Sequence, residues 1–85
     1  MKGKAMLRRA VAVVDARRAL YGEPRHSMEA IAKRWSITLG HPVTPAQVVL
    51  CLIDLKLARL ARDPSHEDSI VDVVGYAAVL GAVAP

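Results

Sequence analysis

The sequence contains no phenylalanine, and its aromatic residues are limited to Tyr21, Trp35 and Tyr76. Hydrophobic residues nevertheless make up 53% of the chain, because alanine, valine and leucine are abundant. Aliphatic side chains of this kind suit closely packed helices. A chain of 85 residues also buries only a limited core. We therefore expect a partner subunit to contribute to its stability.

Several motifs of catalysis and metal binding are also missing. The lone cysteine, Cys51, excludes an internal disulfide, and its apolar neighbours in the sequence predict a small core residue. The three histidines lack metal-ligand spacing, and neither a glycine-rich phosphate loop nor a serine-nucleophile signature occurs. A signal-peptide pattern and an apolar run of the roughly 20 residues needed for a membrane span are absent too. We expect a cytoplasmic protein without a membrane partner.

The net charge of +4 is unevenly distributed along the chain. Without the first 18 residues the chain is close to neutral, so the basic excess belongs to one predicted helix. A basic helix is more often a solvated face than a nucleic-acid surface, so DNA or RNA is the least favoured partner. The residues that carry the excess are Lys2, Lys4, Arg8, Arg9, Arg17 and Arg18, against Asp15.

Periodic apolar positions and end signals predict the first two helices. A helix over residues 4–21 has a stripe of apolar side chains, and Gly22 followed by Pro24 ends it. A second helix over residues 25–39 places its apolar side chains on one face, and Gly40 ends it.

Two more helices follow from capping signals. Thr44 is a typical N-cap, Pro45 suits the first helical position, and Gln47 can reach back to complete a capping box. They open a helix over residues 45–62 that is apolar on nearly every side between Val48 and Leu60. The acids after Ser65 open a last helix over residues 66–82.

We therefore predict an all-α fold, a four-helix bundle-like single domain over residues 1–85. No internal repeat, low-complexity segment or strand-like alternation occurs. A helix that is apolar all round lies either at the centre of a bundle or in a subunit interface. We expect homo-oligomerisation to complete the bundle, through part of the third helix or the C-terminal segment 77–83.

The chemically most suggestive stretch is 56–76, which holds the end of one helix and most of the next. Asp68 and Asp72 are four residues apart, so a helix places both carboxylates on one face. Acids in a first helical turn explain Asp68, but Asp72 is flanked by valines and isoleucine. A carboxylate in such surroundings is costly unless it is paired or holds a metal. A metal site and a structural salt bridge are both open interpretations of Asp72.

Three further side chains also have two interpretations each. Lys56 and Arg59 either clamp a phosphate or complement the dipole at a helix end. Glu29 is the acid within the second helix, and an exposed pair with Lys33 is the favoured interpretation from the residues alone.

Five short patterns follow one another along about residues 18–80 of the chain. Taken in this order, they resemble a family of small phage and prophage proteins, which in turn is similar to the MazG-like all-α nucleoside triphosphate pyrophosphatases. The patterns are Tyr21-Gly22-x-Pro24, Ile31-Ala32-x-x-Trp35, Thr44-Pro45, Leu55-Lys56-x-x-Arg59 and His66-x-Asp68-x-x-x-Asp72-x-x-Gly75-Tyr76.

The resemblance implies a magnesium-dependent hydrolase that cleaves a nucleotide between its α and β phosphates. It implies that Glu29, Asp68 and Asp72 hold magnesium and are catalytic, and that the substrate contacts Lys56, Arg59 and Tyr76. The acidic motifs are shorter than in MazG-like enzymes, because His26 and Ala32 stand where further acids would. The alternative is a catalytically inactive helical module that binds a host protein or, less favoured, nucleic acid. A phage origin would place either protein in the host cytoplasm.

Overall fold

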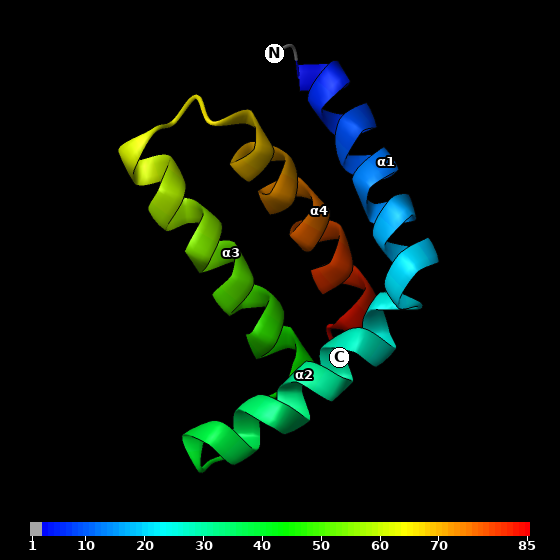
Figure 1. Cartoon of the computed structure of the whole chain (residues 1–85), viewed down its shortest axis with the longest axis vertical. Helices are drawn as coiled ribbons and strands as arrows, with labels where there is room; N and C mark the ends of the chain where they lie inside the picture. The colour runs from blue at the N-terminus through cyan, green and yellow to red at the C-terminus, as the bar shows by residue number, and fades with distance from the viewer. Residues whose placement is uncertain (1–2) are drawn as a thin grey trace.

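The computed structural model describes residues 3–85, which form four α-helices and no strand (Figure 1). The elements are α1 (Gly3–Tyr21), α2 (Pro24–Leu39), α3 (Pro45–Arg62) and α4 (Glu67–Val83). The prediction of an all-α fold is confirmed.

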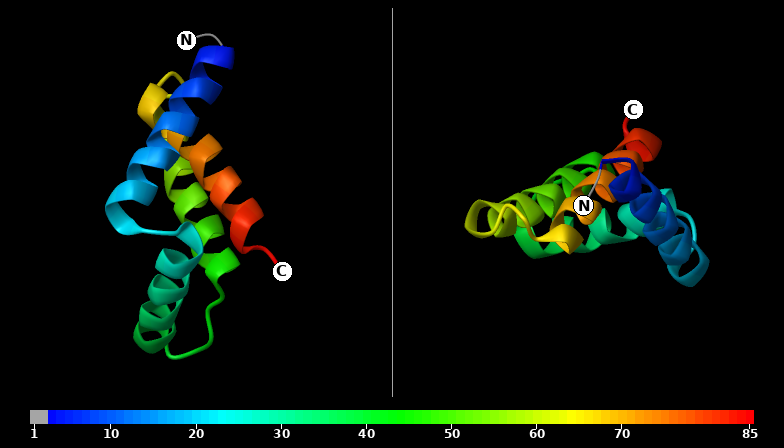
Figure 2. Two further views of the ribbon diagram at one scale, coloured as in Figure 1. Left: turned by 90° about the vertical axis from the view of Figure 1, so that its right-hand side faces the viewer. Right: turned by 90° about the horizontal axis from the view of Figure 1, so that it is seen from above.

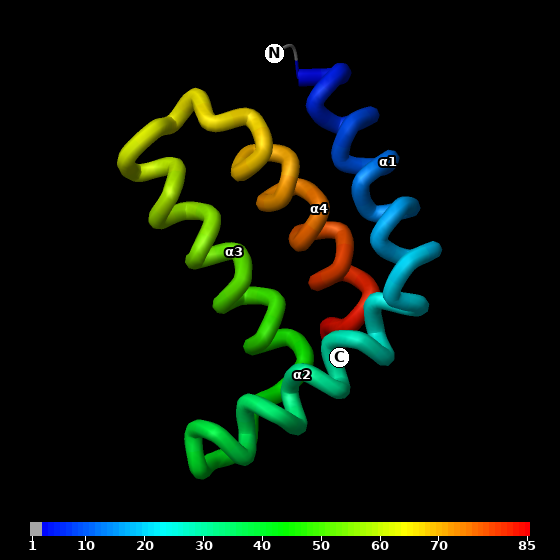
Figure 3. The backbone as a smooth tube through the Cα atoms, in the orientation of Figure 1, coloured from blue at the N-terminus to red at the C-terminus, as the bar shows by residue number. Residues whose placement is uncertain are grey.

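The helix ends follow from local chemistry. Gly22 and Gly40, which follow α1 and α2, have positive φ angles of 85° and 75°, a conformation that glycine adopts without steric cost. Thr44 and Gln47 form the predicted capping box at the start of α3, with each side chain bonded to the other residue's backbone N–H. Figure 3 follows the backbone through the connections that these signals create.

Three of the helices lie side by side as one layer, with α4 between α3 and α1 (Figure 1). α4 runs in roughly the same direction as α1 and opposite to α3. α2 crosses the end of the layer where α4 finishes, far from the start of α4 (Figures 1 and 2). The molecule measures 41 × 30 × 22 Å along its principal axes, so its shortest dimension is about half of its longest.

The hydrophobic core lies where α2, α3 and α4 meet. Val48 and Val49 of α3 are fully buried there, and they pack with the nearly buried Met28 and Ala32 of α2 and Val83 of α4. Trp35 and Tyr76 pack against this cluster from its edge. At about 25 cal/mol per Å² of apolar surface removed from water, a core of so few side chains is a modest source of stability.

Many apolar side chains of the described residues remain in contact with solvent. Cys51, predicted to be a core residue, is exposed, so that prediction is wrong: the apolar run around it spans more than one face of α3. No helix within residues 3–85 is long and apolar enough to cross a membrane. The large exposed hydrophobic residues are Leu7, Val11, Leu20, Tyr21, Ile37, Leu39, Leu50, Leu55 and Leu57.

Candidate functional site

Asp72 lies between two cations that come from different helices. Its Oδ2 atom is 2.9 Å from Nζ of Lys56 on α3, and its Oδ1 atom is 3.2 Å from a terminal nitrogen of Arg17 on α1. The side chains of Asp72 and Lys56 are only 13% and 14% exposed. Asp72 is therefore a paired carboxylate, as its valine-rich surroundings on α4 require. The pairing corresponds to the structural salt bridge, one of the two interpretations of Asp72 from the sequence.

Tyr76 follows Asp72 by one turn of α4 and belongs to the same cluster. The guanidinium of Arg17 lies over its ring, 5.9 Å from the centroid, at a distance where the ring quadrupole attracts a cation. Arg17 thus joins α1 to α4 through both a carboxylate and an aromatic ring. Here we call Lys56, Asp72, Arg17 and Tyr76 the Asp72 cluster.

Asp68 does not share a site with Asp72 but pairs with a different arginine. Arg9 of α1 forms an ion pair with Asp68 and lies 3.6 Å from a carboxylate oxygen of Glu67. The side chains of Asp68 and Arg9 are 70% and 40% exposed, so this contact lies in water. Both acids of the predicted metal face therefore attach α1 to α4.

Arg9 and Arg17 were not among the predicted site residues, because the arginines of a basic helix are more often on a solvated face. The available signal was their position. Arg9 precedes Ala10, which is buried, and Arg17 follows Val14, whose Cγ2 atom would lie 3.4 Å from a Cβ at Gly75. When two helices pack, basic residues that border the contact face of one helix can form ion pairs with acids on the other.

The remaining predicted site residues lie apart from this cluster. Glu29 is exposed on α2 and borders a shallow hollow together with Lys33 and Val43. Arg59 is exposed on α3 and, within residues 3–85, forms no ion pair. The structure therefore brings together Lys56, Asp72 and Tyr76, but not Glu29 or Arg59.

The predicted magnesium ligands Glu29, Asp68 and Asp72 do not converge on one site within residues 3–85. Magnesium prefers octahedral oxygen coordination, commonly from one or two carboxylates completed by waters and phosphate. In the part of the chain that the structure describes, no three acid, histidine or cysteine side chains gather where they could hold a metal ion. Asp72 and Asp68 are each directed at basic side chains instead.

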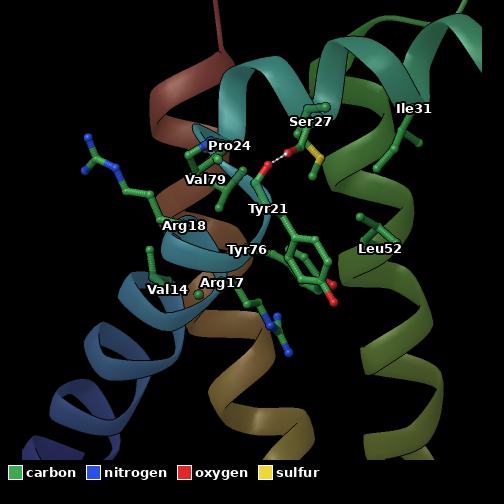
Figure 4. Close-up of a pocket in the computed structure, with 13 residues that line it drawn as sticks. Val14, Arg17, Arg18, Tyr21, Pro24, Ser27, Ile31, Leu52, Tyr76 and Val79 are labelled. Atoms are coloured by element: carbon green, nitrogen blue, oxygen red, sulfur yellow. Dashed lines mark hydrogen bonds between the residues drawn. The ribbon is translucent and has the colours of Figure 1, made fainter.

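A groove of about 420 Å³ opens next to the Asp72 cluster, where the C-terminal half of α1 faces Leu52 of α3, with residues of α4 and of the first half of α2 also lining it (Figure 4). Its walls are mostly apolar and include Val14, Leu52 and Val79. Tyr21 and Tyr76 also line it, and Figure 4 shows their hydroxyl groups pointing toward the same side. Arg17 extends beside the two rings, whereas the guanidinium of Arg18 points outward (Figure 4). We call this feature the α1–α3 groove.

The loop before α4 is organised by its own polar contacts. The backbone N–H and the hydroxyl of Ser65 both donate to Asp63, and these hydrogen bonds lower the pKa of the Asp63 carboxyl. Nδ1 of His66 accepts from the backbone N–H of Ser69 and caps α4. These contacts fix the first turn of α4, from which Asp68 reaches Arg9.

Comparison with known proteins places this geometry in a family. Residues 5–84 match the family model described as a domain of unknown function, DUF6378. The chain belongs to this family. The DUF6378 match spans all four helices, so the Asp72 cluster and the α1–α3 groove both lie within the family domain.

A phage protein is also similar to this DUF6378 chain. The gene 55 protein of Mycobacterium phage L5 is 36% identical over 78 residues, which cover 89% of this chain and 50% of the phage protein. The chain thus spans about half the length of that relative. The prediction of a small phage protein family is confirmed, whereas the similarity to MazG-like enzymes stays a prediction. No solved structure matches the chain.

Proposed function

We propose that this DUF6378 protein is a helical interaction module that acts by binding another protein, not by hydrolysing nucleotides. The observation that carries the proposal is the pairing of Asp72 with Lys56 and Arg17. Asp72 was the strongest candidate for a magnesium ligand and Lys56 for a phosphate contact. Because they neutralise each other within the fold, neither charge is presented to a ligand.

Electrostatics disfavours replacement of the cations around Asp72 by a metal ion. Lys56 and Asp72 are largely removed from water, so releasing one partner would leave the other charge desolvated and unpaired. A magnesium ion that approached Asp72 would also meet the positive charges of Lys56 and Arg17. Both effects favour the ion-pair network over cation binding.

The distribution of apolar side chains supports binding to a protein surface. The chain buries few side chains and leaves large aliphatic residues exposed along α1 and α3, including Leu7, Val11, Leu50 and Leu57. Contiguous apolar surface on a small protein is typical of an interaction site. Homo-oligomerisation through α3 belongs to the same proposal, because Leu50 and Leu57 lie two turns apart on one face of that helix.

The nucleotide pyrophosphohydrolase is the second candidate, and one observation favours it. Arg17 and Tyr76 lie together beside the α1–α3 groove, and a cation next to an aromatic ring suits a phosphate next to a base. In this candidate Glu29, Asp68 and Asp72 would hold magnesium, which neutralises phosphate charge and activates water. That set requires Glu29 to come from a second chain or from a rearranged fold.

One experiment separates the two candidates. The protein is incubated with magnesium and a panel of ribonucleoside and deoxyribonucleoside triphosphates, and monophosphate and pyrophosphate are measured by chromatography. We expect no product above the level of a protein-free control. Formation of both products by wild type, but not by Asp72→Asn, would overturn the interaction-module proposal.

Self-association has its own test. Sedimentation velocity at micromolar concentration should show a dimer or larger species, and Leu57→Glu should shift it toward the monomer. A wild-type protein that sediments only as a monomer would contradict homo-oligomerisation while leaving the interaction with a different protein untouched.

A further inference from the structure

The α1–α3 groove lies beside the Asp72 cluster, and the ion pairs of that cluster do not fill it. Its volume of about 420 Å³ is large enough for several apolar side chains or a small ligand. No acidic residue lines it, and its two arginines pair with acids outside the lining, Arg17 with Asp72 and Arg18 with Glu23. The groove is therefore apolar inside and bordered by positive charge.

The apolar surface continues beyond the groove along α1. Val14 and Tyr21 line the groove, and Leu7 and Val11 precede them at spacings of three and four residues on the same stripe of the helix. Leu7 is 56% exposed and Val11 is 61% exposed. From Leu7 to Tyr21 the stripe is about 21 Å long at 1.5 Å per residue. A small molecule bound in the groove would leave the N-terminal half of this stripe, with Leu7 and Val11, uncovered.

A helix laid alongside α1 would cover the whole stripe. An amphipathic helix carries apolar anchors at spacings of three and four residues, and such anchors would reach the groove and the stripe together. The layer of α3, α4 and α1 has an open face at this place, because α2 covers only the end where α4 finishes (Figures 1 and 2).

Charge selects the kind of helix. Arg8 lies next to the stripe and forms no ion pair with any residue that the structure describes, while Arg17 and Arg18 are 47% and 58% exposed in their side chains. The Arg18–Glu23 pair is exposed on both sides and contributes little in water, so Arg18 and Arg8 can take carboxylates of a partner at small cost. Arg17, in contrast, stays paired with the largely buried Asp72. A second copy of this chain would instead bring another net charge of +4 and another arginine-rich α1 to the same surface.

We infer that the α1–α3 groove and the apolar stripe of α1 bind an acidic amphipathic helix of another protein. The inference rests on the proposed interaction module and names its binding surface and the chemistry of its partner. The apolar anchors of the partner enter beside Tyr21 and Tyr76, and carboxylates on the flanks of its helix pair with Arg8 and Arg18. Asp15 is the one acid of α1, and the basic residues of this helix outnumber it: Lys4, Arg8, Arg9, Arg17 and Arg18.

The test uses synthetic helical peptides of about 18 residues, long enough to cover the 21 Å stripe. One peptide has leucine at alternating spacings of three and four with glutamate on the flanks, and its control has lysine in place of every glutamate. Binding to the full chain is measured by isothermal titration calorimetry. We expect the acidic peptide to bind at least about tenfold more tightly than the basic one, a difference of about 1.4 kcal/mol.

Two substitutions on neighbouring residues locate the site. Tyr21 and Leu20 are 70% and 72% exposed at the end of the same helix, but only Tyr21 lines the groove. Tyr21→Ser should weaken the acidic peptide at least about tenfold, and Leu20→Ser should change its affinity less than about twofold. The helix content of both variants is checked by circular dichroism.

Each other outcome overturns the inference in a recognisable way. Equal binding of both peptides would exclude an acidic partner, and equal loss in the two variants would exclude the groove. Absence of peptide binding would overturn this inference but not the interaction module, which fails only if nucleotide hydrolysis is found. A wild-type oligomer that Tyr21→Ser dissociates would assign the groove to a second copy of the chain.

Discussion

α1 and α3 border the same central helix but are attached to it by different forces. α3 buries Val48 and Val49 completely against α2 and α4. In α1 the one buried residue is Ala10, and the helix reaches α4 through arginine–carboxylate pairs and the close approach of Val14 to Gly75. One side of the molecule is thus held by apolar packing and the other largely by charge.

The difference explains why surface is available on α1. The arginine pairs and Val14 attach α1 without Leu7 and Val11, which stay exposed. On α3 the apolar side chains that face the core stabilise the fold by being buried. The two attachments should therefore respond differently to substitution, to salt and to pH.

Introducing a charge at an apolar position should give the largest difference in stability between a variant of α3 and a variant of α1. Val48→Asp places a carboxylate at a position with 0% exposure, and we expect a loss of about 4 kcal/mol or more, enough to unfold a domain of this size. Val11→Asp, at a position 61% exposed, should change stability by less than about 0.5 kcal/mol. Urea unfolding followed by circular dichroism measures both. Similar losses of stability in the two variants would contradict the difference between a buried α3 face and an exposed α1 stripe.

Removing a paired arginine should loosen α1 alone. Arg17→Ala removes the partner of Asp72 and the cation over Tyr76, and we expect a loss of about 1–2 kcal/mol with faster hydrogen exchange along α1. Arg8→Ala is the matched control, because Arg8 forms no ion pair within residues 3–85. Equal effects of the two substitutions would show that charge does not attach α1.

Salt should act in the same direction as that substitution. Raising the ionic strength from 0.05 to about 1 M shortens the screening length to about 3 Å and weakens exposed pairs such as Arg9–Asp68. Hydrogen exchange should then increase in α1 relative to the first half of α3. An unchanged ratio would mean that apolar contacts alone hold α1.

The smallest expected effect concerns the loop before α4. Because hydrogen bonds from Ser65 lower the pKa of Asp63 in the folded state, its stabilising contribution is present above the unfolded pKa of about 4. It is lost as the pH falls through the lowered folded pKa. Thermal melts of wild type and Ser65→Ala should therefore differ at pH 6 and converge toward pH 2. A difference that is constant over this range would remove Asp63 as its cause.

Local features of the fold could be predicted from the sequence, and features that depend on docking could not. The capping box of Thr44 and Gln47 and the glycines after α1 and α2 act within a few residues, so their patterns predict helix ends directly. The partners of Asp72 depend on how α1 packs against α4. The sequence led to a structural salt bridge as one interpretation of Asp72, but not to Arg17 as one of its partners.

Glu29 shows the opposite limitation. It is an acid within a helix, but α2 crosses the far end of the layer from the start of α4, where Asp68 lies (Figure 1). Residue types and spacing within one helix carry no information about that crossing. A ligand set drawn from two helices therefore needs the packing of the helices before it can be assigned.

The central claim is that Asp72 is an ion-pair partner and not a magnesium ligand. Thermal and urea unfolding of wild type and Asp72→Asn, each with and without millimolar magnesium, tests it most directly, with the exposed Asp68→Asn as control. We predict that Asp72→Asn loses about 3 kcal/mol with or without magnesium, because it strands Lys56, and that magnesium leaves wild type unchanged. An Asp72→Asn protein as stable as wild type without metal, together with a magnesium stabilisation present only in wild type, would contradict the claim.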